Sequence, residues 1–331
     1  MSFESFRSYF DAAFSAYLEK NIATFSGYSS SPAVAAIAQY AARVASGGKR
    51  FRPYLAYVAL GVQDPYEHTE LFVAIELLHV FALIHDDIMD NGDTRHGVPC
   101  AHRAFATQYD SVRIGDGVAI LLGDVVFQWS YEALLSYGES HQAERSLLIS
   151  IWGELIREVI HGQMLDVISP AQSAYTQELI EQKMYLKTAR YSFVQPMRLG
   201  FAAAGVLDQN NEFAETFGRA LGLMFQLQDD LLDVIEGHDK SSFLDIETKQ
   251  QTLLSWYIQT QAQEKYAQSF AQYFGKTLDA SDKKNITTLL EESGARSYVQ
   301  ERIDAYYQEA LGVAHTEEWN TLAAMVYARS K

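Results

Sequence analysis

Residues 77–90 read LLHVFALIHDDIMD, and residues 221–233 repeat the arrangement as LGLMFQLQDDLLD. Each stretch is mostly apolar and ends on the same order of residues, which is Asp-Asp, two apolar residues and Asp. Neither stretch has the composition of a helix surface. The repeat therefore predicts two largely buried helices, each of which ends in a group of three carboxylates.

The spacing within each group brings carboxylates together. On an α-helix, residues i and i+4 share one face, so Asp86 stacks with Asp90 and Asp229 with Asp233. Such carboxylates repel one another unless a cation lies on them, and their burial is costly. Each group alone also fits an acidic patch on a solvated helix, or the turn that ends one. Together they indicate a shared load of hard divalent ions, most plausibly Mg²⁺, that carries a phosphorylated substrate.

Composition favours one large helical domain. The chain has 331 residues, 48% of them hydrophobic, with only 6 prolines and 20 glycines. Almost no segment alternates as a half-buried strand does. Cys100 is the only cysteine, which excludes a disulfide framework and a zinc cage. We expect a single all-α domain, larger than a four-helix bundle, with its site in a cavity between helices.

Turn and cap signals divide the chain into helices. Ser31-Pro32 and Pro53 open the first two, Asn91-Gly92 ends the third, and Pro196 should kink or divide a later one. Residues 236–247 are predicted to form a loop. The predicted helices are 33–45, 54–60, 67–90, 101–108, 116–137, 141–168, 175–204, 211–235, 250–275, 281–292, 295–312 and 317–329.

The formal charge of −16, from 26 basic and 42 acidic side chains, argues against a nucleic-acid partner. The N-terminus has no basic-then-apolar signal, and no apolar run reaches the roughly 18 residues that span a bilayer. These features predict a cytoplasmic protein without a membrane span. An acidic protein that binds phosphate needs metal ions or a few well-placed cations.

Cations of that kind occur at a glycine-opened corner, residues 47–53, where Lys49 and Arg52 are three residues apart. Free backbone N–H groups and two cations can hold a diphosphate without metal. The spacing is not that of a P-loop, and a helix end decorated with cations is the alternative. Arg95, Lys187 and Lys240 are further candidates, although each alone fits a solvated cation.

Seven short motifs occur in order between residues 45 and 255. They are Gly47-Gly48-Lys49-x-x-Arg52-Pro53, His85-Asp86-Asp87-x-x-Asp90 with Arg95, Gly97-x-Pro99, Gly123-Asp124, Gly162-Gln163-x-x-Asp166, Lys187-Thr188-Ala189 and Phe225-Gln226-x-Gln228-Asp229-Asp230-x-x-Asp233. In this order they closely resemble the trans-isoprenyl diphosphate synthases, which elongate allylic diphosphates with isopentenyl diphosphate.

The resemblance implies the isoprenoid synthase fold, in which ten or more helices surround a deep central cavity, here as one domain over residues 1–331. It also implies a homodimer, for which the apolar stretch 116–135 is the candidate interface. The expected reaction is head-to-tail prenyl transfer, and its cofactor is three Mg²⁺ ions, for which Mn²⁺ can substitute.

The resemblance also assigns roles to individual residues. The direct metal ligands would be Asp86, Asp90 and Asp229. Waters or hydrogen bonds would connect the metals to Asp87, Asp230, Asp233, Gln163 and Asp166. The allylic diphosphate would be bound by Arg95, Lys187, Thr188, Gln226 and Lys240. Isopentenyl diphosphate would be bound without metal by Gly48, Lys49, Arg52, His79 and His96.

Three positions depart from the family pattern. The family usually has a second arginine where this chain has His96, which would make isopentenyl diphosphate binding weaker or sensitive to pH near neutrality. After the second cluster, Phe243-Leu244-Asp245 replaces Gly-Ser/Thr-Asp. Gln250 stands where a lysine is expected, with Lys249 one position early.

Product length is expected to depend on Phe81 and Ala82, which precede the first cluster by five and four residues. An ideal helical wheel puts Ala82 about 40° from Asp86 and Phe81 about 140° away. The role of Phe81 as a cavity floor therefore comes from the resemblance alone. One bulky ring beside a small residue resembles enzymes that make the C20 product, geranylgeranyl diphosphate; the C15 product is the next expectation.

Two other functions remain open. Class I terpene cyclases ionise the same substrates, but they generally have one Asp-rich motif and no basic pocket for a second diphosphate. A non-catalytic subunit of a synthase heterodimer tends to lose one Asp cluster, and both are intact here. Elongated product, cyclic hydrocarbon or no product would separate the three functions.

Overall fold

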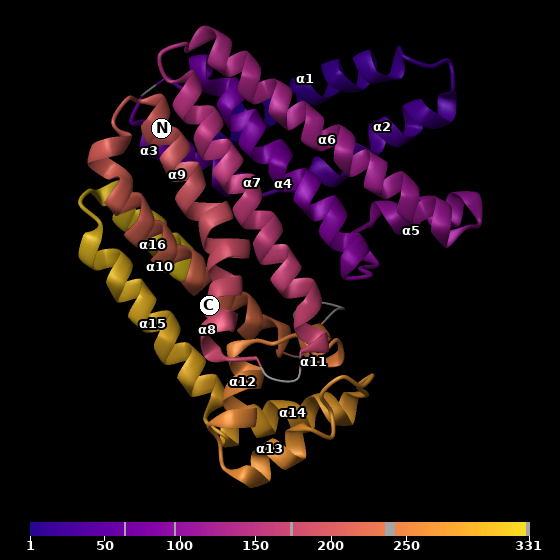
Figure 1. The fold of residues 1–331 in the computed structure, drawn as a ribbon, viewed down its shortest axis with the longest axis vertical. Coiled ribbons are helices and arrows are strands. Elements are labelled where there is room, and N and C mark those ends of the chain that lie inside the picture. The colour runs from indigo at the N-terminus through magenta and orange to yellow at the C-terminus, as the bar shows by residue number, and fades with distance from the viewer. Residues whose placement is uncertain (63, 96, 173–174, 236–241, 329–331) are drawn as a thin grey trace. The chain divides into compact units, whose positions relative to one another are not determined.

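The computed structural model describes residues 1–62, 64–95, 97–172, 175–235 and 242–328 (Figure 1). Within these ranges the chain is almost entirely helical, which confirms the all-α prediction. The helices form two compact units, Met1–Ser150 with Leu199–Val206, and Ile151–Arg198 with Leu207–Lys331. A single domain stays a prediction, and each unit is described by itself.

The first unit is built around α4 (Thr69–Met89), which packs against the other helices that lie wholly in this unit. Its residues from Leu71 to Leu78 are all buried, because the sequence is apolar on every face except at Glu76. The other elements of this unit are α1 (Phe3–Ser26), α2 (Pro32–Ala45), α3 (Phe51–Leu60), η1 (Tyr66–His68), β1 (Thr94–Arg95), β2 (Val98–Pro99), α5 (Ala101–Tyr109) and α6 (Val112–Ser140).

The end of α4 is a sharp stop. Asn91 adopts a left-handed backbone conformation, and the N–H of Gly92 donates to the carbonyl of Asp87, which closes the last turn. A short hairpin follows, in which Arg95 of β1 pairs with Val98 of β2. The break predicted at Asn91-Gly92 is therefore confirmed.

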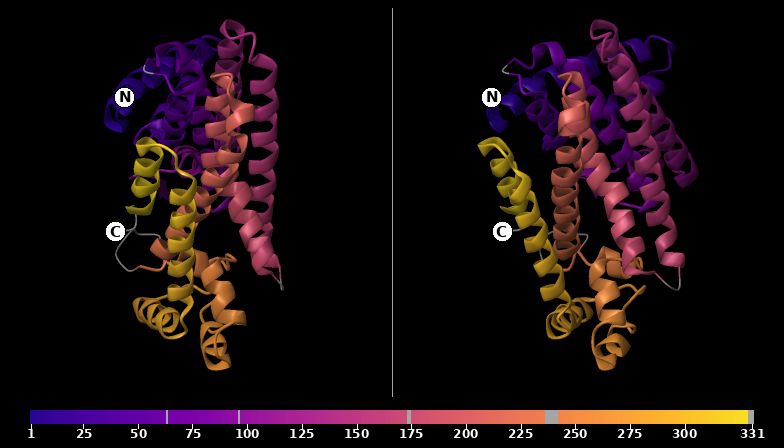
Figure 2. Two further views of the ribbon diagram at one scale, coloured as in Figure 1. Left: turned by 90° about the vertical axis from the view of Figure 1, so that its left-hand side faces the viewer. Right: turned by 60° about the vertical axis from the view of Figure 1, so that its left-hand side comes forward.

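The second unit is built around α10 (Leu207–Asp233), which packs against η3, α15, α16, α8 and α12. Helix α15 lies alongside α10 in each view (Figures 1 and 2). The other elements of this unit are η2 (Ser169–Ala171), α8 (Gln177–Met184), η3 (Tyr185–Val194), α11 (Leu244–Glu247), α12 (Leu253–Thr260), α13 (Glu264–Phe270), α14 (Ala280–Glu292), α15 (Ala295–Val313) and α16 (Glu317–Tyr327). Two helices, α7 (Arg145–Ile168) and α9 (Gln195–Ala203), contribute residues to both units.

Residues 175–204, predicted as one helix that Pro196 kinks or divides, form three helical pieces. The middle piece, η3, is a π-helix, and the N–H of Gln195 donates to the carbonyl of Arg190 five residues earlier. Pro196 lies in the first turn of α9 and has no N–H to donate. The wider helical register ends at Val194, just before this proline, so the division begins eleven residues before the position that the sequence indicates.

Three further elements differ from the predictions. Helix α1 is not among the predicted helices, although Phe6, Phe10 and Phe14 form a buried face at i, i+4 spacing. The helix predicted over 250–275 is two helices, α12 and α13, which are separated by residues 261–263. The predicted loop over 236–247 contains α11 in its described part.

Helix α6 is, among the described residues, long and apolar enough to cross a membrane by length and composition alone. The sequence predicts no segment of sufficient length and apolar character, so α6 differs from that expectation. In the structure, 44% of its most apolar window is buried inside the protein. Core helices of soluble proteins pass the same test, so the composition of α6 does not by itself indicate a membrane span.

Candidate active site

The first acidic cluster ends α4. Asp86 is half-buried, and Asp90, which follows the last helical residue, is exposed. The N–H of Asp90 donates to the carbonyl of Asp86 at 2.8 Å, so the two residues lie one turn apart. The structure thus has the i, i+4 relationship that the sequence predicts for these two carboxylates.

The third carboxylate of this cluster, Asp87, is buried and bound by Arg95. Nη2 and Nε of Arg95 donate to Oδ1 of Asp87 at 2.6 and 2.9 Å. Nη2 also lies 4.0 Å from Oδ2 of Asp86. Burial and the charge of Asp87 raise the pKa of the Cys100 thiol to about 12, so this cysteine is inert as a nucleophile. The hydrogen bonds from Arg95 to Asp87 thus hold the cluster in place at its middle aspartate.

The corner between α2 and α3 is anchored by Arg50, which has a left-handed backbone. Its buried guanidinium donates to Asp11 at 2.7 Å, to Glu76 at 2.7 Å and to the carbonyl of Ala45 at 2.8 Å. A Cβ on Gly48 would come within 2.4 Å of this guanidinium, which explains a glycine at that position. Arg50 is thus a structural residue that fastens the corner to α4.

The other polar residues predicted at this corner lie around that anchor. Lys49 is exposed and precedes the N-cap of α3, and Arg52 is half-buried in the first turn of that helix. His79 is half-buried on α4, three residues after Glu76, and therefore on the same face as the carboxylate that binds Arg50. The structure places all three beside one corner of the first unit.

The predicted chain-length residues, Phe81 and Ala82, lie little more than one turn before Asp86 on α4, and both are half-buried. The ring of Phe81 contacts the ring of Phe127 on α6, with centroids 4.9 Å apart, and the edge of His85 at 4.7 Å. Phe81 thus faces α6, which agrees with its wheel position away from Asp86.

The second acidic cluster ends α10. Asp229 and Asp233 are half-buried and Asp230 is buried. The carboxylate of Asp233 accepts hydrogen bonds from the N–H groups of Leu244 and Asp245 at 3.1 and 3.2 Å. These bonds bring a fourth carboxylate, that of Asp245, to the cluster.

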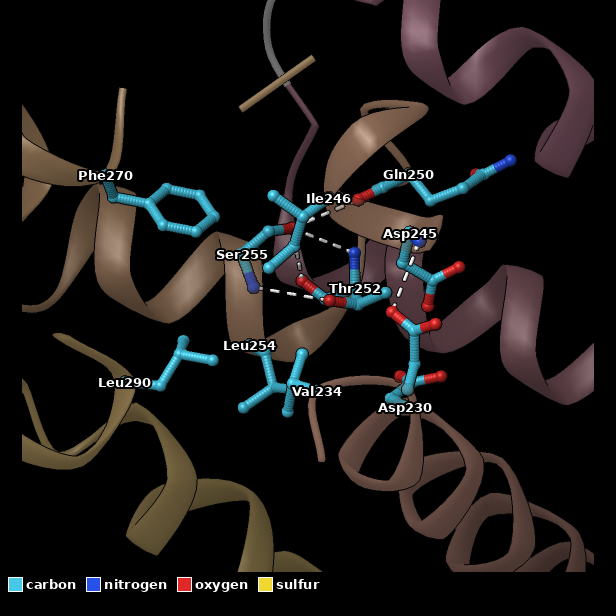
Figure 3. Close-up of a pocket in the computed structure, with 11 residues that line it drawn as sticks. Asp230, Val234, Asp245, Ile246, Gln250, Thr252, Leu254, Ser255, Phe270 and Leu290 are labelled. Carbon is cyan, nitrogen blue, oxygen red and sulfur yellow. Dashed lines mark hydrogen bonds between the residues drawn. The ribbon is translucent and has the colours of Figure 1, made fainter. Parts of the chain in front are cut away.

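Asp230, Asp233 and Asp245 line the same pocket, in which carboxylates form one end and apolar side chains such as Phe270 and Leu290 the other (Figure 3). Burial, followed by the charge of Asp245, raises the pKa of both Asp230 and Asp233. Burial likewise raises the pKa of Asp245, and nearby Lys183 opposes this. Three carboxyl groups that ionise only reluctantly are therefore concentrated at this end of the pocket.

The donor set fits a hard divalent cation. Each cluster offers carboxylate oxygens, which Mg²⁺ prefers, and the raised pKa values in the second cluster show that added positive charge would relieve it. Within the described residues, no group of three or more His, Cys, Asp or Glu side chains forms a complete metal site. Mg²⁺ commonly takes one or two carboxylates and completes its shell with water and substrate phosphates. The aspartates here fit that mode.

The π-helix η3 carries the next two predicted residues. Lys187 donates to Oδ2 of Asp166 on α7 at 2.5 Å. The hydroxyl of Thr188 donates to Oε1 of Gln226 on α10 at 2.6 Å, and Nε2 of Gln226 donates to Oδ1 of Asp230 at 2.9 Å. Hydrogen bonds thus connect these residues of η3 with α7 and with the second cluster.

This connection requires α7 and η3 to run very close together. A Cβ built on Gly162 would lie 2.4 Å from the backbone nitrogen of Lys187, so only glycine fits there. The close approach explains the glycine of the Gly162-Gln163-x-x-Asp166 motif. Gln163 and Asp166 follow it on the same helix, α7.

A buried arginine locks η3 to its neighbours. Arg190 donates to Glu154 at 2.6 Å and Glu158 at 2.8 Å on α7, and also pairs with Glu215 on α10. Three carboxylates around one guanidinium hold the π-helix in register, and with it Lys187 and Thr188.

Three residues of this site escaped the sequence analysis or were given no role in it. Lys183 and Arg190 are buried cations whose importance comes from partners distant in sequence, whereas Asp245 lies within the segment predicted as a loop. Its match to the aspartate of the family loop was the available signal. Two predicted residues, His96 and Lys240, lie outside the described residues. The remaining predicted roles stay predictions.

Comparison with known proteins places this geometry in a family. The model of the polyprenyl synthetase family matches residues 32–291. A short chain isoprenyl diphosphate synthase of Methanothermobacter thermautotrophicus is 34% identical over 199 residues, which cover 59% of this chain and 57% of that protein. The matched segment therefore spans little more than half the length of this relative. A geranylfarnesyl diphosphate synthase of Aeropyrum pernix is 26% identical over 279 residues, which cover 81% of this chain and 83% of that protein.

The fold is also similar to that of a solved prenyl synthase structure. The crystal structure of a geranylgeranyl pyrophosphate synthase from Corynebacterium glutamicum, complexed with isoprenyl diphosphate and magnesium, superposes with a TM-score of 0.88 at 25% identity. The superposition covers 100% of this chain and 99% of that one, which confirms the predicted isoprenoid synthase fold. Because the family match extends over the 47–53 corner, both acidic clusters and η3, the chain belongs to the polyprenyl synthetase family.

Proposed function

We propose that this protein is a prenyltransferase that condenses isopentenyl diphosphate with an allylic diphosphate, with Mg²⁺ as cofactor and the C20 prenyl diphosphate as favoured product. The observation that carries this proposal is the second cluster, where buried carboxylates adjoin the hydrogen-bonded series Thr188, Gln226 and Asp230. This arrangement suits a cation that arrives with phosphate oxygens.

Asp86, Asp90 and Asp229 would hold the metal ions. Mg²⁺ supplies charge neutralisation, which makes diphosphate a better leaving group. Lys187 and Thr188 donate to the diphosphate oxygens of the allylic substrate, and Arg190 keeps both residues oriented. The allylic C–O bond breaks, the double bond of isopentenyl diphosphate forms the new C–C bond, and the released diphosphate accepts the proton. The protein therefore needs no general base of its own.

Lys49, Arg52 and His79 would bind isopentenyl diphosphate without metal. The support is the Arg50 anchor, which satisfies its own charge within the fold and fixes the backbone on either side of it. Charge-assisted bonds to diphosphate then come from the neighbouring cations.

We also propose a homodimer through the stretch 116–135 of α6. Within that stretch Ile120, Leu121 and Tyr131 are 46, 64 and 40% exposed, which is unusual for one helix face in a monomer. Light scattering should give a mass near twice 37.2 kDa. Leu121→Lys should shift the protein to a monomer, whereas a wild-type monomer at micromolar concentration would contradict this assembly.

The decisive experiment supplies isopentenyl diphosphate, farnesyl diphosphate and Mg²⁺ to the purified protein and measures product length by chromatography after dephosphorylation. A C20 alcohol is expected. A cyclic hydrocarbon would instead indicate a terpene cyclase, and no product with any primer would indicate a non-catalytic subunit. Extension of shorter primers only would remove the C20 assignment while prenyl transfer stands.

A further inference from the structure

The carboxylate of Asp166 is shared by two lysines one helical turn apart. Oδ1 lies 3.0 Å from Nζ of Lys183 and Oδ2 lies 2.5 Å from Nζ of Lys187. Lys183 is in the last turn of α8, and Lys187 is in the first turn of η3. Burial alone would raise the pKa of Asp166, but the two ammonium charges hold it below its usual value. Asp166 is therefore an ionised carboxylate in a largely buried position.

The two lysines differ in how firmly they are held. The side chain of Lys183 is only 10% exposed, and its ammonium also donates to the carbonyl of Gln251 at 3.0 Å. The side chain of Lys187 is 26% exposed and adjoins Thr188, which belongs to the series that leads to Asp230. Lys183 thus lies between two acceptors, whereas Lys187 is the more exposed of the two lysines.

A move by Lys187 has an electrostatic consequence. If its ammonium turns toward a diphosphate, it gives up part or all of its bond to Asp166. A buried carboxylate left without a cation is strongly unfavourable, and that cost would be subtracted from substrate binding. The second cation on Asp166 removes this cost, because Lys183 stays in place when Lys187 leaves.

We propose that Lys183 is a positioning residue that keeps Asp166 charge-paired, and thereby releases Lys187 to bind the allylic diphosphate. This inference rests on the proposed function of Lys187. The competing explanation is that Lys183 only fastens α8 to the segment at Gln251. The proposal requires the charge of Lys183, whereas the competing explanation requires only its hydrogen bonds.

The variant Lys183→Gln separates charge from hydrogen bonding, since a glutamine amide donates to the same acceptors without charge. Binding of farnesyl thiolodiphosphate, an unreactive analogue with sulfur in place of the scissile oxygen, is measured by titration calorimetry with Mg²⁺. Lys183→Gln should weaken binding by about tenfold or more, because Lys187 becomes the only cation on Asp166. Lys183→Arg, which keeps the charge, should bind within about threefold of the wild type.

A double-mutant cycle with Asp166→Asn completes the test. When residue 166 is neutral, Lys187 has no anion to leave, so Lys183→Gln should change affinity by less than about threefold in that background. Equal losses in both backgrounds, unchanged binding in Lys183→Gln, or loss of the native circular dichroism spectrum in that variant would each overturn the proposal. Failure of the folded wild type to bind the analogue would instead count against the proposed function.

Discussion

The imidazole of His85 occupies the space beside Gly123 that any other side chain would need. A Cβ built on Gly123 would lie 2.2 Å from Nε2 of His85, which also approaches the carbonyl of Ile120 at 3.1 Å. His85 immediately precedes Asp86, so this contact between α4 and α6 fixes the approach to the first acidic cluster. The position of Asp86 on α4 therefore depends on the absence of a side chain at Gly123 on α6.

Gly123→Ala should therefore reduce both stability and turnover. Displacing the ring of His85 is an overpacking change, which typically costs about 1–3 kcal/mol. Gly117→Ala on the same helix is the matched control, because a Cβ there meets nothing within 4 Å. That control should be neutral or stabilise by up to roughly 1 kcal/mol through helix propensity. Thermal unfolding and kcat of both variants test this, and equal behaviour of the two would contradict it.

Activity should depend on divalent metal through both acidic clusters. Chelation should abolish prenyl transfer, and Mg²⁺ or Mn²⁺ should restore it. Asp86→Ala and Asp229→Ala should each lower kcat by several orders of magnitude while the fold survives, since each removes a repelling carboxylate. Glu19→Ala, which removes an exposed charge on α1, is the control and should keep full activity. Full turnover in excess chelator would contradict the metal-dependent mechanism.

Stability without metal should fall as pH rises. Burial and the charge of Asp245 raise the pKa of Asp233 to about 8. Because this is above the value of 3.8 for an unperturbed aspartate, the folded state binds more protons. Its stabilising contribution is present below pH ~4 and is lost as pH rises toward ~8. The melting temperature in chelator should drop from pH 5 to 8, and Mg²⁺ should restore it most at pH 8. Asp233→Asn should make the melting temperature in chelator less dependent on pH. A wild-type melting temperature in chelator that rises with pH would refute this.

The corner at residues 47–53 should serve one substrate only. Lys49→Ala and Arg52→Ala should raise KM for isopentenyl diphosphate much more than KM for the allylic substrate, because a charge-assisted bond is lost. Arg43→Ala is the control, since this exposed cation on α2 stacks on Tyr40 and has no predicted role at the site. Equal increases in both KM values would show that the corner does not distinguish the substrates.

The sequence predicts where the central helices α4 and α10 end, because the residues that determine these ends are close together in the sequence. Apolar runs lead to Asp86 and Asp229, and Asn91-Gly92 marks a stop that the structure confirms. At the 47–53 corner, the three-residue spacing selects Lys49 and Arg52, whereas the structure shows that Arg50 between them is the buried anchor. That distinction depends on Glu76, which is distant in sequence.

The π-helix could not be predicted in the same way. Its register depends on the missing N–H of Pro196 and on the carboxylates that surround Arg190, two from α7 and one from α10. No periodicity within residues 185–194 encodes partners on other helices. The place of Asp245 at the second cluster was missed for a related reason. It lies in a segment predicted as a loop, and the hydrogen bond from its N–H to Asp233, a residue distant in sequence, brings it to the cluster.

Product length should respond to the aromatic contact between α4 and α6. If Phe81 forms the floor of the elongation cavity, Phe81→Ala should lengthen products beyond those of the wild type. Phe127 packs against that ring at 4.9 Å, so Phe127→Ala should lengthen products as well, by removing the support that holds Phe81 in place. Ala82→Phe adds a second ring next to the first and should shorten products to C15.

The same chromatographic assay of dephosphorylated products tests all three variants, with isopentenyl diphosphate in excess so that supply does not limit chain growth. Phe105→Leu is the control, because Phe105 on α5 packs against Tyr40 instead of Phe81 and should leave product length unchanged. The double variant Phe81→Ala/Phe127→Ala decides whether the rings act as a unit. If Phe127 acts only by supporting Phe81, it should add no length once Phe81 is alanine, whereas additive lengthening would mean that each ring blocks the chain independently. Unchanged product length in Phe81→Ala would show that the floor of the cavity lies elsewhere.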